Sequence, residues 1–268
     1  MVYQKFMPEG WDTSIEPMSE TIIQDARNNG IILQGLVNKC DETGNLYLNL
    51  GKGIKGIVPL EEVEAVKVNN KGIPKKEICF NKVNKIIQFK VLGKDEKTNQ
   101  YILSRKSVGK EATKWMLEEL KEGQTVNGIV RNITDYGAFI EIGGGIVGLA
   151  YIEDLSVARI KSPEERLKIG QKLKVVIKSI NREDKKISLS YKEVLGTWEE
   201  NASKFTQGEI VEGIIRETEK ENRGIFIEIT PNLIGMAEYK SGYEYGQKVS
   251  VYIKKILPQK KKIKLVII

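Results

Sequence analysis

One arrangement of glycines recurs three times along this chain of 268 residues. Two glycines five positions apart open each copy, a short alternating run containing an aromatic residue follows, and another glycine lies nine residues after that aromatic. The opening pairs are Gly30 and Gly35, Gly123 and Gly128, and Gly208 and Gly213; the runs are LYLNL (46–50), AFIEI (138–142) and IFIEI (225–229); the later glycines are Gly56, Gly148 and Gly235. Because self-similarity at a long period marks units that fold alike, the chain is predicted to be an array of three equivalent domains.

The alternating runs predict β-strands with one face in a core. In the second copy, the period of two places Ala138, Ile140 and Ile142 on the core face and Phe139 and Glu141 on the outer face. Each copy contains about five such short strands, and the segment Ser162–Glu165 has the pattern of a capped short helix before the fourth. The predicted fold is mainly β, with three tandem five-stranded OB-fold barrels joined by short helical connectors.

Charge and helical pattern divide the chain into six segments. The net charge of +7 is concentrated in the three repeats, and the segments between them are slightly acidic. Residues 110–121 are predicted to form a helix that Gly123 ends, and Trp115 and Trp198 are predicted to anchor the connectors by packing. The predicted segments are a leader (1–29), a first barrel (30–106), a connector (107–122), a second barrel (123–192), a connector (193–206) and a third barrel (207–268).

Several classes of function are excluded or disfavoured by composition. The chain has no histidine, so histidine-based acid–base catalysis and histidine-ligated metals are excluded. Its two cysteines, Cys40 and Cys79, are far apart and form no zinc motif, and no cofactor is predicted. The sequence shows the pattern of neither a secretory signal nor a membrane-spanning stretch. Two thiols in a chain of this length are typical of a reducing compartment. A cytoplasmic location is therefore expected.

The outward aromatic residues have two interpretations. A neighbouring loop or helix could cover them, or they could stack on unpaired bases beside cationic side chains. Recurrence in three positively charged repeats favours stacking, most strongly in the second repeat. The residues predicted to bind RNA are Tyr136, Phe139, Tyr151, Asn181, Arg182 and Lys186 in the second repeat, Phe226, Lys260, Lys261 and Lys262 in the third, and Tyr47 in the first. The lysine run is equally well explained as a solvated turn.

These residues carry a resemblance to a known family. The segments GQTVNGIVRNITDYGAFIEIGGGIVGLAYIEDL and ERLKIGQKLKVVIKSINREDKKISLSYK of the second repeat resemble the RNA-binding repeat of the bacterial 30S ribosomal protein S1 family. The third repeat matches more weakly, in EGIIRETEKENRGIFIEI and YGQKVSVYIKKI. The first, with NLYLNLGKGIKGIVPLEEV, is similar to the first repeat of that family. The resemblance covers about residues 30–268.

The resemblance implies a set of RNA-contacting positions. Tyr136 and Phe139 match the two aromatic residues of the family's RNA face, and Tyr151 stands where the family usually has a histidine. Asn181 stands near the usual aspartate and Lys186 near the usual basic residue. The first and third repeats keep only one ring each, and first repeats of the family tend to dock on protein, so the first barrel is a candidate contact with the 30S subunit.

The predicted function is binding of single-stranded RNA without catalysis. The resemblance implies a role in translation, holding mRNA at the small ribosomal subunit. An alternative is an RNA-binding regulator or RNA chaperone that is not stably bound to the ribosome. A protein-docking adaptor and a ribonuclease are weaker hypotheses; the latter lacks carboxylates in metal-binding spacing.

Overall fold

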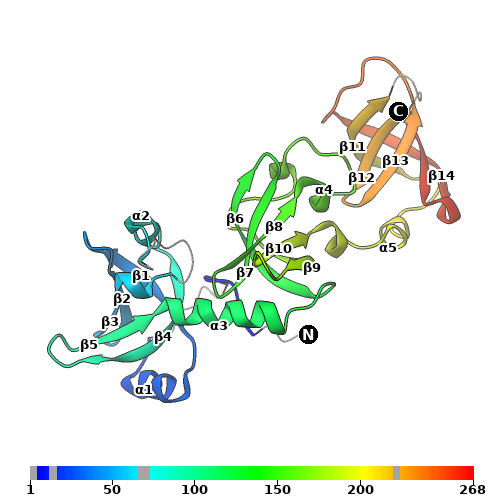
Figure 1. Ribbon diagram of the computed structural model, residues 1–268. Coiled ribbons are helices and arrows are strands. Elements are labelled where there is room, and N and C mark those ends of the chain that lie inside the picture. Colours follow the sequence, from blue (N-terminus) through cyan, green and yellow to red (C-terminus); the bar gives the residue numbers. More distant parts are fainter. Residues whose placement is uncertain (1–4, 12–16, 65–72, 220–223) are drawn as a thin grey trace.

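The computed structural model describes residues 5–11, 17–64, 73–219 and 224–268, which form three closed barrels of five strands each. The barrels follow one another along the chain and are numbered here in that order (Figure 1). The long helix α3 (Arg105–Glu118) joins the first barrel to the second. The predicted class, a mainly β chain of three tandem five-stranded barrels, is confirmed.

All three barrels share one strand order. The first strand pairs with the second and the fourth, and the third strand closes the barrel by pairing in parallel with the fifth. The strands are β1 (Leu33–Cys40), β2 (Leu46–Gly51), β3 (Ile54–Val58), β4 (Ile86–Asp95) and β5 (Gln100–Ser104) in the first barrel; β6 (Thr125–Thr134), β7 (Gly137–Gly143), β8 (Ile146–Tyr151), β9 (Lys172–Asn181) and β10 (Lys186–Ser190) in the second; and β11 (Ile210–Glu219), β12 (Gly224–Thr230), β13 (Leu233–Glu238), β14 (Lys248–Leu257) and β15 (Lys262–Ile267) in the third.

Short helices fill the connections between strands and between barrels. The predicted capped helix is a 3-10 turn in which Ser162 and Glu165 form a reciprocal capping box. The helical segments other than α3 are α1 (Glu20–Asn29), η1 (Leu60–Glu62), α2 (Lys76–Phe80), α4 (Ile152–Leu155), η2 (Pro163–Glu165), η3 (Lys192–Leu195), α5 (Trp198–Ala202) and η4 (Pro258–Lys260). Within the described ranges, no helix is long and apolar enough to cross a membrane.

The recurring glycine of the third strand has a packing cause. A Cβ at Gly148 would lie 2.7 Å from the side chain of Leu189, which fills the barrel from the fifth strand. The same clash would arise at Gly56 with Leu103 and at Gly235 with Leu265. A real Cβ does not approach other atoms so closely, so each barrel needs a glycine at this position to bring its parallel pair of strands together.

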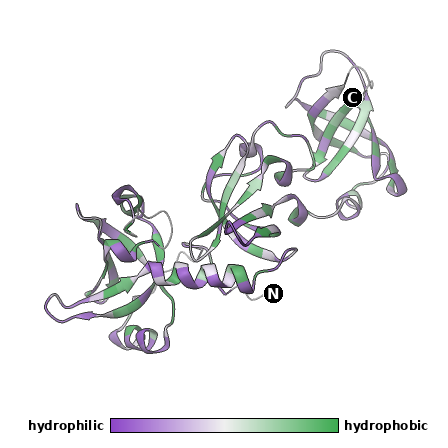
Figure 2. Cartoon of the chain, viewed as in Figure 1, coloured by the Kyte–Doolittle hydropathy of each residue, from purple (hydrophilic) through white to green (hydrophobic). Residues whose placement is uncertain are grey.

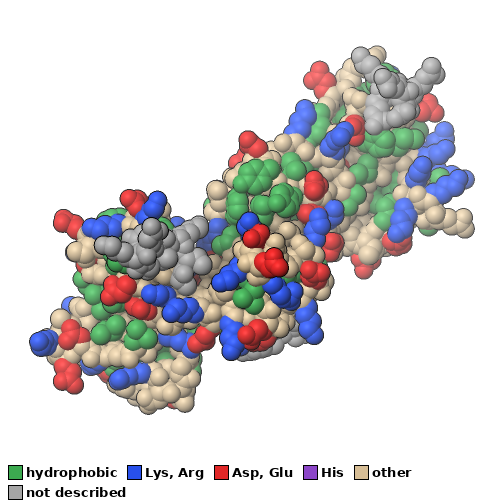
Figure 3. Space-filling model, viewed as in Figure 1, with side chains coloured by type: hydrophobic (Ala, Val, Ile, Leu, Met, Phe, Trp, Pro, Cys, Tyr) green, Lys and Arg blue, Asp and Glu red, His purple; other side chains and the backbone are tan. Residues whose placement is uncertain are grey.

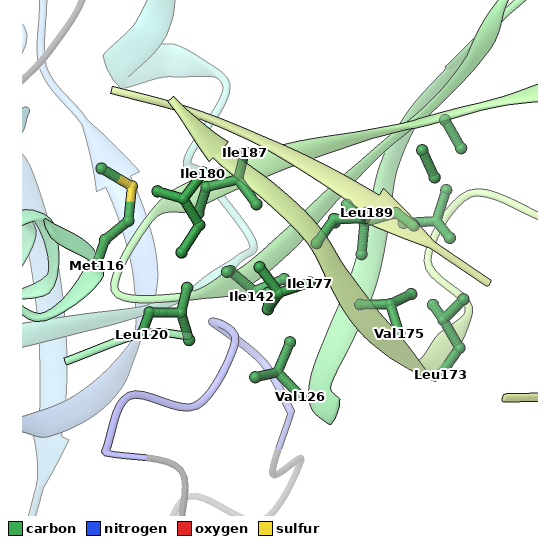
Figure 4. Close-up of a cluster of buried hydrophobic side chains, with 14 of the residues drawn as sticks. Met116, Leu120, Val126, Ile142, Leu173, Val175, Ile177, Ile180, Ile187 and Leu189 are labelled. Carbon is green, nitrogen blue, oxygen red and sulfur yellow. The ribbon is translucent and has the colours of Figure 1, made fainter. Parts of the chain in front are cut away.

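The cores lie on the face that the alternation predicts. Ala138, Ile140 and Ile142 are completely buried, and hydrophobic and hydrophilic residues interchange along the strands of each barrel (Figure 2). Figure 4 shows Met116 of α3 and Leu120, which follows it, beside the side chains that fill the second barrel. The connector therefore contributes to the core of the barrel that it precedes.

The first connector helix differs from its predicted range. It begins at Arg105 rather than at residue 110, because Ser104 at the end of β5 caps it by accepting a hydrogen bond from the backbone N–H of Ser107. It ends at Glu118, so Gly123 does not terminate it. Trp115 is buried against the core of the second barrel, and Trp198 packs against the core of the third, as predicted.

Two glutamates predicted to face outward lie outside their barrels but are buried. Glu141 on β7 pairs with Arg131 on β6 and accepts a hydrogen bond of 3.0 Å from the backbone N–H of Glu9. At the equivalent place in the third barrel, Glu228 pairs with Arg216 and with an arginine of the second barrel, Arg166. Both glutamates are on the outer face of their strands, and they are buried there because the preceding part of the chain covers each of them.

Residues 5–11 contact both the first and the second barrel and hold the two in place. The ring of Phe6 is buried, with its centroid 5.6 Å from that of Trp115. Glu9 receives two hydrogen bonds from the Arg105 guanidinium, at 2.6 and 3.0 Å, and its carbonyl accepts one of 2.6 Å from Arg131. Glu64 of the first barrel lies 2.6 Å from the same Arg105. One arginine thus holds the N-terminal segment, the first barrel and α3 in contact.

Acidic pH is expected to weaken the contact between Glu9 and Arg105. Burial works to raise the pKa of Glu9, but the charges of Arg105 and Lys82 outweigh it and lower that pKa from 4.5 to about 2. The pKa of Glu141, by contrast, is raised, first by burial and then by the Glu9 charge, while Arg131 acts in the opposite direction. A lowered pKa in the folded state stabilises the protein above the unfolded value, so this contribution is lost as the pH falls from about 4.5 towards 2.

Urea unfolding at several pH values measures this loss. We expect the free energy of unfolding to decline with acid in the parent and to decline less steeply in Glu9→Gln, which carries no titrating group at this position. Other carboxylates add to the parent's slope, so the variant's slope is reduced and not abolished. Equal slopes in the two proteins would contradict the assignment.

Candidate nucleic-acid interface

Three aromatic rings meet at one end of the second barrel. Phe139 is half-buried on β7, and the ring of Tyr136, in the turn before β7, meets it edge to face with centroids 6.3 Å apart. Tyr151 ends β8 and lies across the strand pair from Gly137, the residue after Tyr136. Tyr136 is 52% and Tyr151 is 42% exposed. The rings predicted from the sequence are therefore brought together and remain open to solvent.

The backbone beneath the rings has little freedom. A Cβ at Gly137 would lie 2.4 Å from the carbonyl oxygen of Ala150, so the turn needs glycine there. The backbone N–H of Ile152 donates a hydrogen bond of 2.9 Å to the carbonyl of Tyr136. Since both Tyr136 and Tyr151 are adjacent to these contacts, the two exposed rings are carried on a fixed part of the barrel.

The outer face continues from Phe139 across the sheet. Its cross-strand neighbour is Leu149 on β8, and the next neighbour is Ser188 on β10. Leu149 and Ser188 were not predicted, although the alternation of β8 and β10 places both on the outer face. Figure 3 shows hydrophobic side chains gathered on the surface of the second barrel. A flat, partly apolar platform of this kind suits the faces of unpaired bases.

The polar residues predicted beside the rings divide into two groups. Asn181 and Lys186 face each other across β9 and β10, and the Lys186 ammonium lies 3.6 Å from Asp184 and is largely exposed. Arg182 instead donates a hydrogen bond of 2.9 Å to the carbonyl of Leu117 at the end of α3. Its guanidinium therefore serves the connector, and the geometry does not support the prediction that Arg182 belongs with the rings.

The third barrel carries a phenylalanine and two lysines on the row of cross-strand neighbours that corresponds to Phe139, Leu149 and Ser188 in the second barrel. Phe226 on β12 is half-buried, its cross-strand neighbour is Met236, and Lys264 and Lys255 follow across β15 and β14. These two lysines were not predicted. The predicted Lys260, Lys261 and Lys262 lie at the turn between β14 and β15, where Lys261 is 3.0 Å from Glu199 of α5.

Tyr47, the outward aromatic residue of the first barrel, is hydrogen-bonded to the loop between β1 and β2. The Tyr47 hydroxyl donates a hydrogen bond of 3.0 Å to Asp41. Burial works to raise the pKa of Asp41, but hydrogen bonds from Thr43, Asn45 and Tyr47 outweigh it and hold this pKa well below its usual range. The cross-strand neighbours of Tyr47 are Lys39 on β1 and Ile57 on β3, and Ile102 on β5 follows Ile57. This row has one cation and two aliphatic residues beside Tyr47 and offers no second ring.

The described residues were compared with the arrangements that hold metal ions in proteins. No group of three or more cysteine, aspartate or glutamate side chains in the described residues is arranged to hold a metal ion. Cys79 is buried, and burial raises the pKa of its thiol to about 11, so it is a poor nucleophile. The outer face of the second barrel is therefore characterised by its aromatic rings, its cationic side chains and the partly apolar surface between them.

Comparison with known proteins agrees with this geometry. Residues 119–192, the second barrel with the short segment between α3 and β6, match the model of the S1 RNA binding domain. The small ribosomal subunit protein bS1 of Staphylococcus aureus strain COL is 33% identical over 223 residues, which are 81% of this chain and 54% of that protein. A bS1 homolog of Bacillus cereus is 32% identical over 83% of this chain and 59% of that protein. The chain thus spans little more than half the length of these curated relatives.

The fold and the ring-bearing face define a protein of tandem S1-type barrels, and its second barrel is an S1 RNA binding domain. The chain as a whole is a relative of the bacterial ribosomal protein bS1, as the resemblance of its repeats indicated.

Proposed function

We propose that this chain binds single-stranded RNA through the ring-bearing face of the second barrel and holds mRNA at the small ribosomal subunit in the cytoplasm. The observation that carries the proposal is the meeting of Tyr136, Phe139 and Tyr151, two of them well exposed, on a barrel that matches the S1 RNA binding domain. Base stacking on such rings tolerates different sequences, as a protein that holds many messages requires. The role is one of binding, without catalysis.

The first barrel is proposed to contact protein of the 30S subunit rather than RNA. Its outer row carries two isoleucines and Lys39 beside a single ring, and the hydroxyl of that ring is held by Asp41. An open hollow of ≈ 330 Å³ lies beside that ring, lined by Asn38, Asn49 and Lys55 among others. In the second and third barrels the positions of Asn38 and Asn49 carry the Arg–Glu pairs that contact the preceding part of the chain. The equivalent surface of the first barrel thus suits a protein neighbour.

Co-sedimentation tests the ribosomal part of this proposal. Purified protein is layered with 30S subunits on a sucrose gradient, with and without excess unstructured oligoribonucleotide. We expect it to migrate with the subunits and to stay there in the presence of the oligonucleotide, since the first barrel makes a protein contact. Release by the oligonucleotide, with intact RNA binding, would favour an RNA-binding regulator that is not stably bound to the ribosome.

Salt is expected to weaken RNA binding in a graded way. The repeats carry the basic excess of the chain, so binding should release counterions, and log K should fall with log salt by about 0.7 for each phosphate neutralised. Fluorescence anisotropy of a labelled oligoribonucleotide over a salt series gives this slope. A stronger preference for duplex RNA, or affinity independent of salt, would contradict single-strand binding by these barrels.

A further inference from the structure

The segment between α4 and η2, residues 156–161, belongs to the second barrel and reaches the third. Burial alternates along it: Ala158 and Ile160 are buried, and Ile160 is part of the core of the second barrel. The residues between and after them are exposed; they are Val157, Arg159 and Lys161. One side of the segment is therefore fixed on the barrel, and the other side presents one apolar and two cationic side chains to solvent.

The segment begins close to the rings of the second barrel. Tyr151 ends β8, α4 follows it directly, and Ser156 is the first residue after α4. Because α4 has only four residues, it advances the chain by about 6 Å along its axis. Figure 1 shows α4 on the side of the second barrel towards β11 and β12. The exposed side of the segment thus starts near the exposed ring of Tyr151 and leads towards the third barrel.

Arg159 connects the segment to the ring-bearing row of the third barrel. It forms an ion pair with Glu217 on β11, and Glu217 is the cross-strand neighbour of Phe226 on β12. The row continues from Phe226 to Met236 and Lys264. The segment therefore lies between the rings of the second barrel and the ring of the third.

Contacts with the third barrel fix both ends of the segment. The Oγ of Ser156 accepts a hydrogen bond of 2.8 Å from Arg166, whose guanidinium also pairs with Glu228 on β12. At the other end, the backbone N–H of Lys161 donates a hydrogen bond of 3.0 Å to the Tyr245 hydroxyl, and the Lys161 ammonium lies 4.3 Å from the centroid of that ring. The path from one barrel to the other is therefore already formed in the structure.

Arg159 differs from the other arginines that join these two barrels in the described part of the chain. Arg166 and Arg216 pair with glutamates across the junction, and their side chains are only 8% and 6% exposed. The side chain of Arg159 is 74% exposed, and an ion pair at the surface contributes little to stability. A guanidinium has five N–H donors, and the bond to Glu217 uses one of them. The other donors suit the oxygens of a phosphate group.

We propose that residues 156–161 carry a single strand of RNA from the ring-bearing face of the second barrel to the Phe226 row of the third, and that Arg159 binds a phosphate on this path. Val157 and Lys161 lie on either side of Arg159 and complete the exposed side of the path. The inference rests on the RNA-binding function proposed above and adds to it a contact that only a strand spanning two barrels can make.

Two lengths of RNA test the proposal on the full chain. An oligouridylate of about six nucleotides is near the lower end of the site size of one OB fold, and one of about 24 nucleotides can span two. In fluorescence anisotropy we expect Arg159→Ala to weaken binding of the long strand roughly fivefold or more, which is about 1 kcal/mol, and to leave binding of the short strand unchanged. The slope of log K against log salt for the long strand should become shallower by about 0.7, the value for one phosphate.

Three further variants show what the arginine does. Arg27→Ala removes the same charge from an exposed position on α1 and should change binding of neither strand. Arg159→Lys keeps a cation and should recover most of the affinity that Arg159→Ala loses. Glu217→Gln breaks the ion pair but leaves the guanidinium free for phosphate, so it should keep or increase affinity for the long strand. If Glu217→Gln weakens binding as much as Arg159→Ala does, the ion pair only orients the third barrel, and the phosphate contact is refuted.

The remaining outcomes overturn either the proposal or the function on which it rests. Equal weakening of both strands in Arg159→Ala would place Arg159 in the ring site of one barrel and refute a path between barrels. No weakening of the long strand in a variant that melts like the parent would also refute it, as would a parent protein that binds both lengths equally well. A parent protein that binds neither strand would overturn the RNA-binding function itself, so the two failures are distinguishable.

Discussion

Replacing Phe139 by alanine is expected to weaken binding of an unstructured oligoribonucleotide by about 1–3 kcal/mol, or roughly 5- to 150-fold in Kd. Phe139 lies at the centre of the platform, between Tyr136 and Leu149. Its loss removes one stacking surface and the edge-to-face partner of Tyr136. Fluorescence anisotropy at a fixed salt concentration measures the change.

The equivalent rings of the other barrels provide matched controls. Tyr47→Ala should have little effect on RNA binding, because its hydroxyl is held by Asp41 and its row of cross-strand neighbours contains no second ring. Phe226→Ala should have an intermediate effect, since Lys255 and Lys264 on the same row can still contact phosphates. If Tyr47→Ala costs as much as Phe139→Ala, the division among barrels is wrong. If no variant loses affinity while each melts like the parent, the rings have only a packing role.

Replacing Arg105 by alanine is expected to destabilise the protein by about 3–5 kcal/mol, the cost of removing one partner from a buried ion pair. Arg105 is buried with Glu9 and Glu64, and removing its guanidinium leaves two carboxylates near each other with Lys82 as the neighbouring cation. Urea unfolding, monitored by tryptophan fluorescence, should report the loss, since Trp115 lies on the same helix.

Arg159→Ala is the control for loss of an arginine. Arg159 pairs with Glu217 at the surface, with most of its side chain exposed, so its removal should cost no more than about 1 kcal/mol. Similar decreases in the free energy of unfolding of Arg105→Ala and Arg159→Ala would show that the Arg105 cluster does not hold the two barrels together. RNA binding of folded Arg105→Ala at low temperature should remain, because the guanidinium of Arg105 bonds to Glu9, Glu64 and the carbonyl of Val63 and to none of the three rings among the described residues.

The sequence was sufficient for the repeats and for a five-stranded barrel in each of them. Alternation determines which residues enter a barrel, as at Ala138 and Ile140. It carries no information on what covers the outside, so it did not indicate that Glu141 and Glu228, on the outer face, are buried between successive units. For the same reason Arg182 was expected beside the rings, although it bonds to the end of α3. Lys255 was missed because the irregularity in β14 changes the alternation after Ile253.

The hydrogen bond between Glu9 and Glu141 joins residues 132 positions apart, which matters for the order of events during synthesis. At about 5–20 residues per second, the translating ribosome takes roughly 7–26 s to add the chain between these two residues. Before β7 is made, Glu9 already has Lys82 and Arg105 as partners, in the first barrel and at the start of α3. The segment can therefore settle on the first barrel early, and the bond to Glu141 adds the second barrel to a contact that already exists.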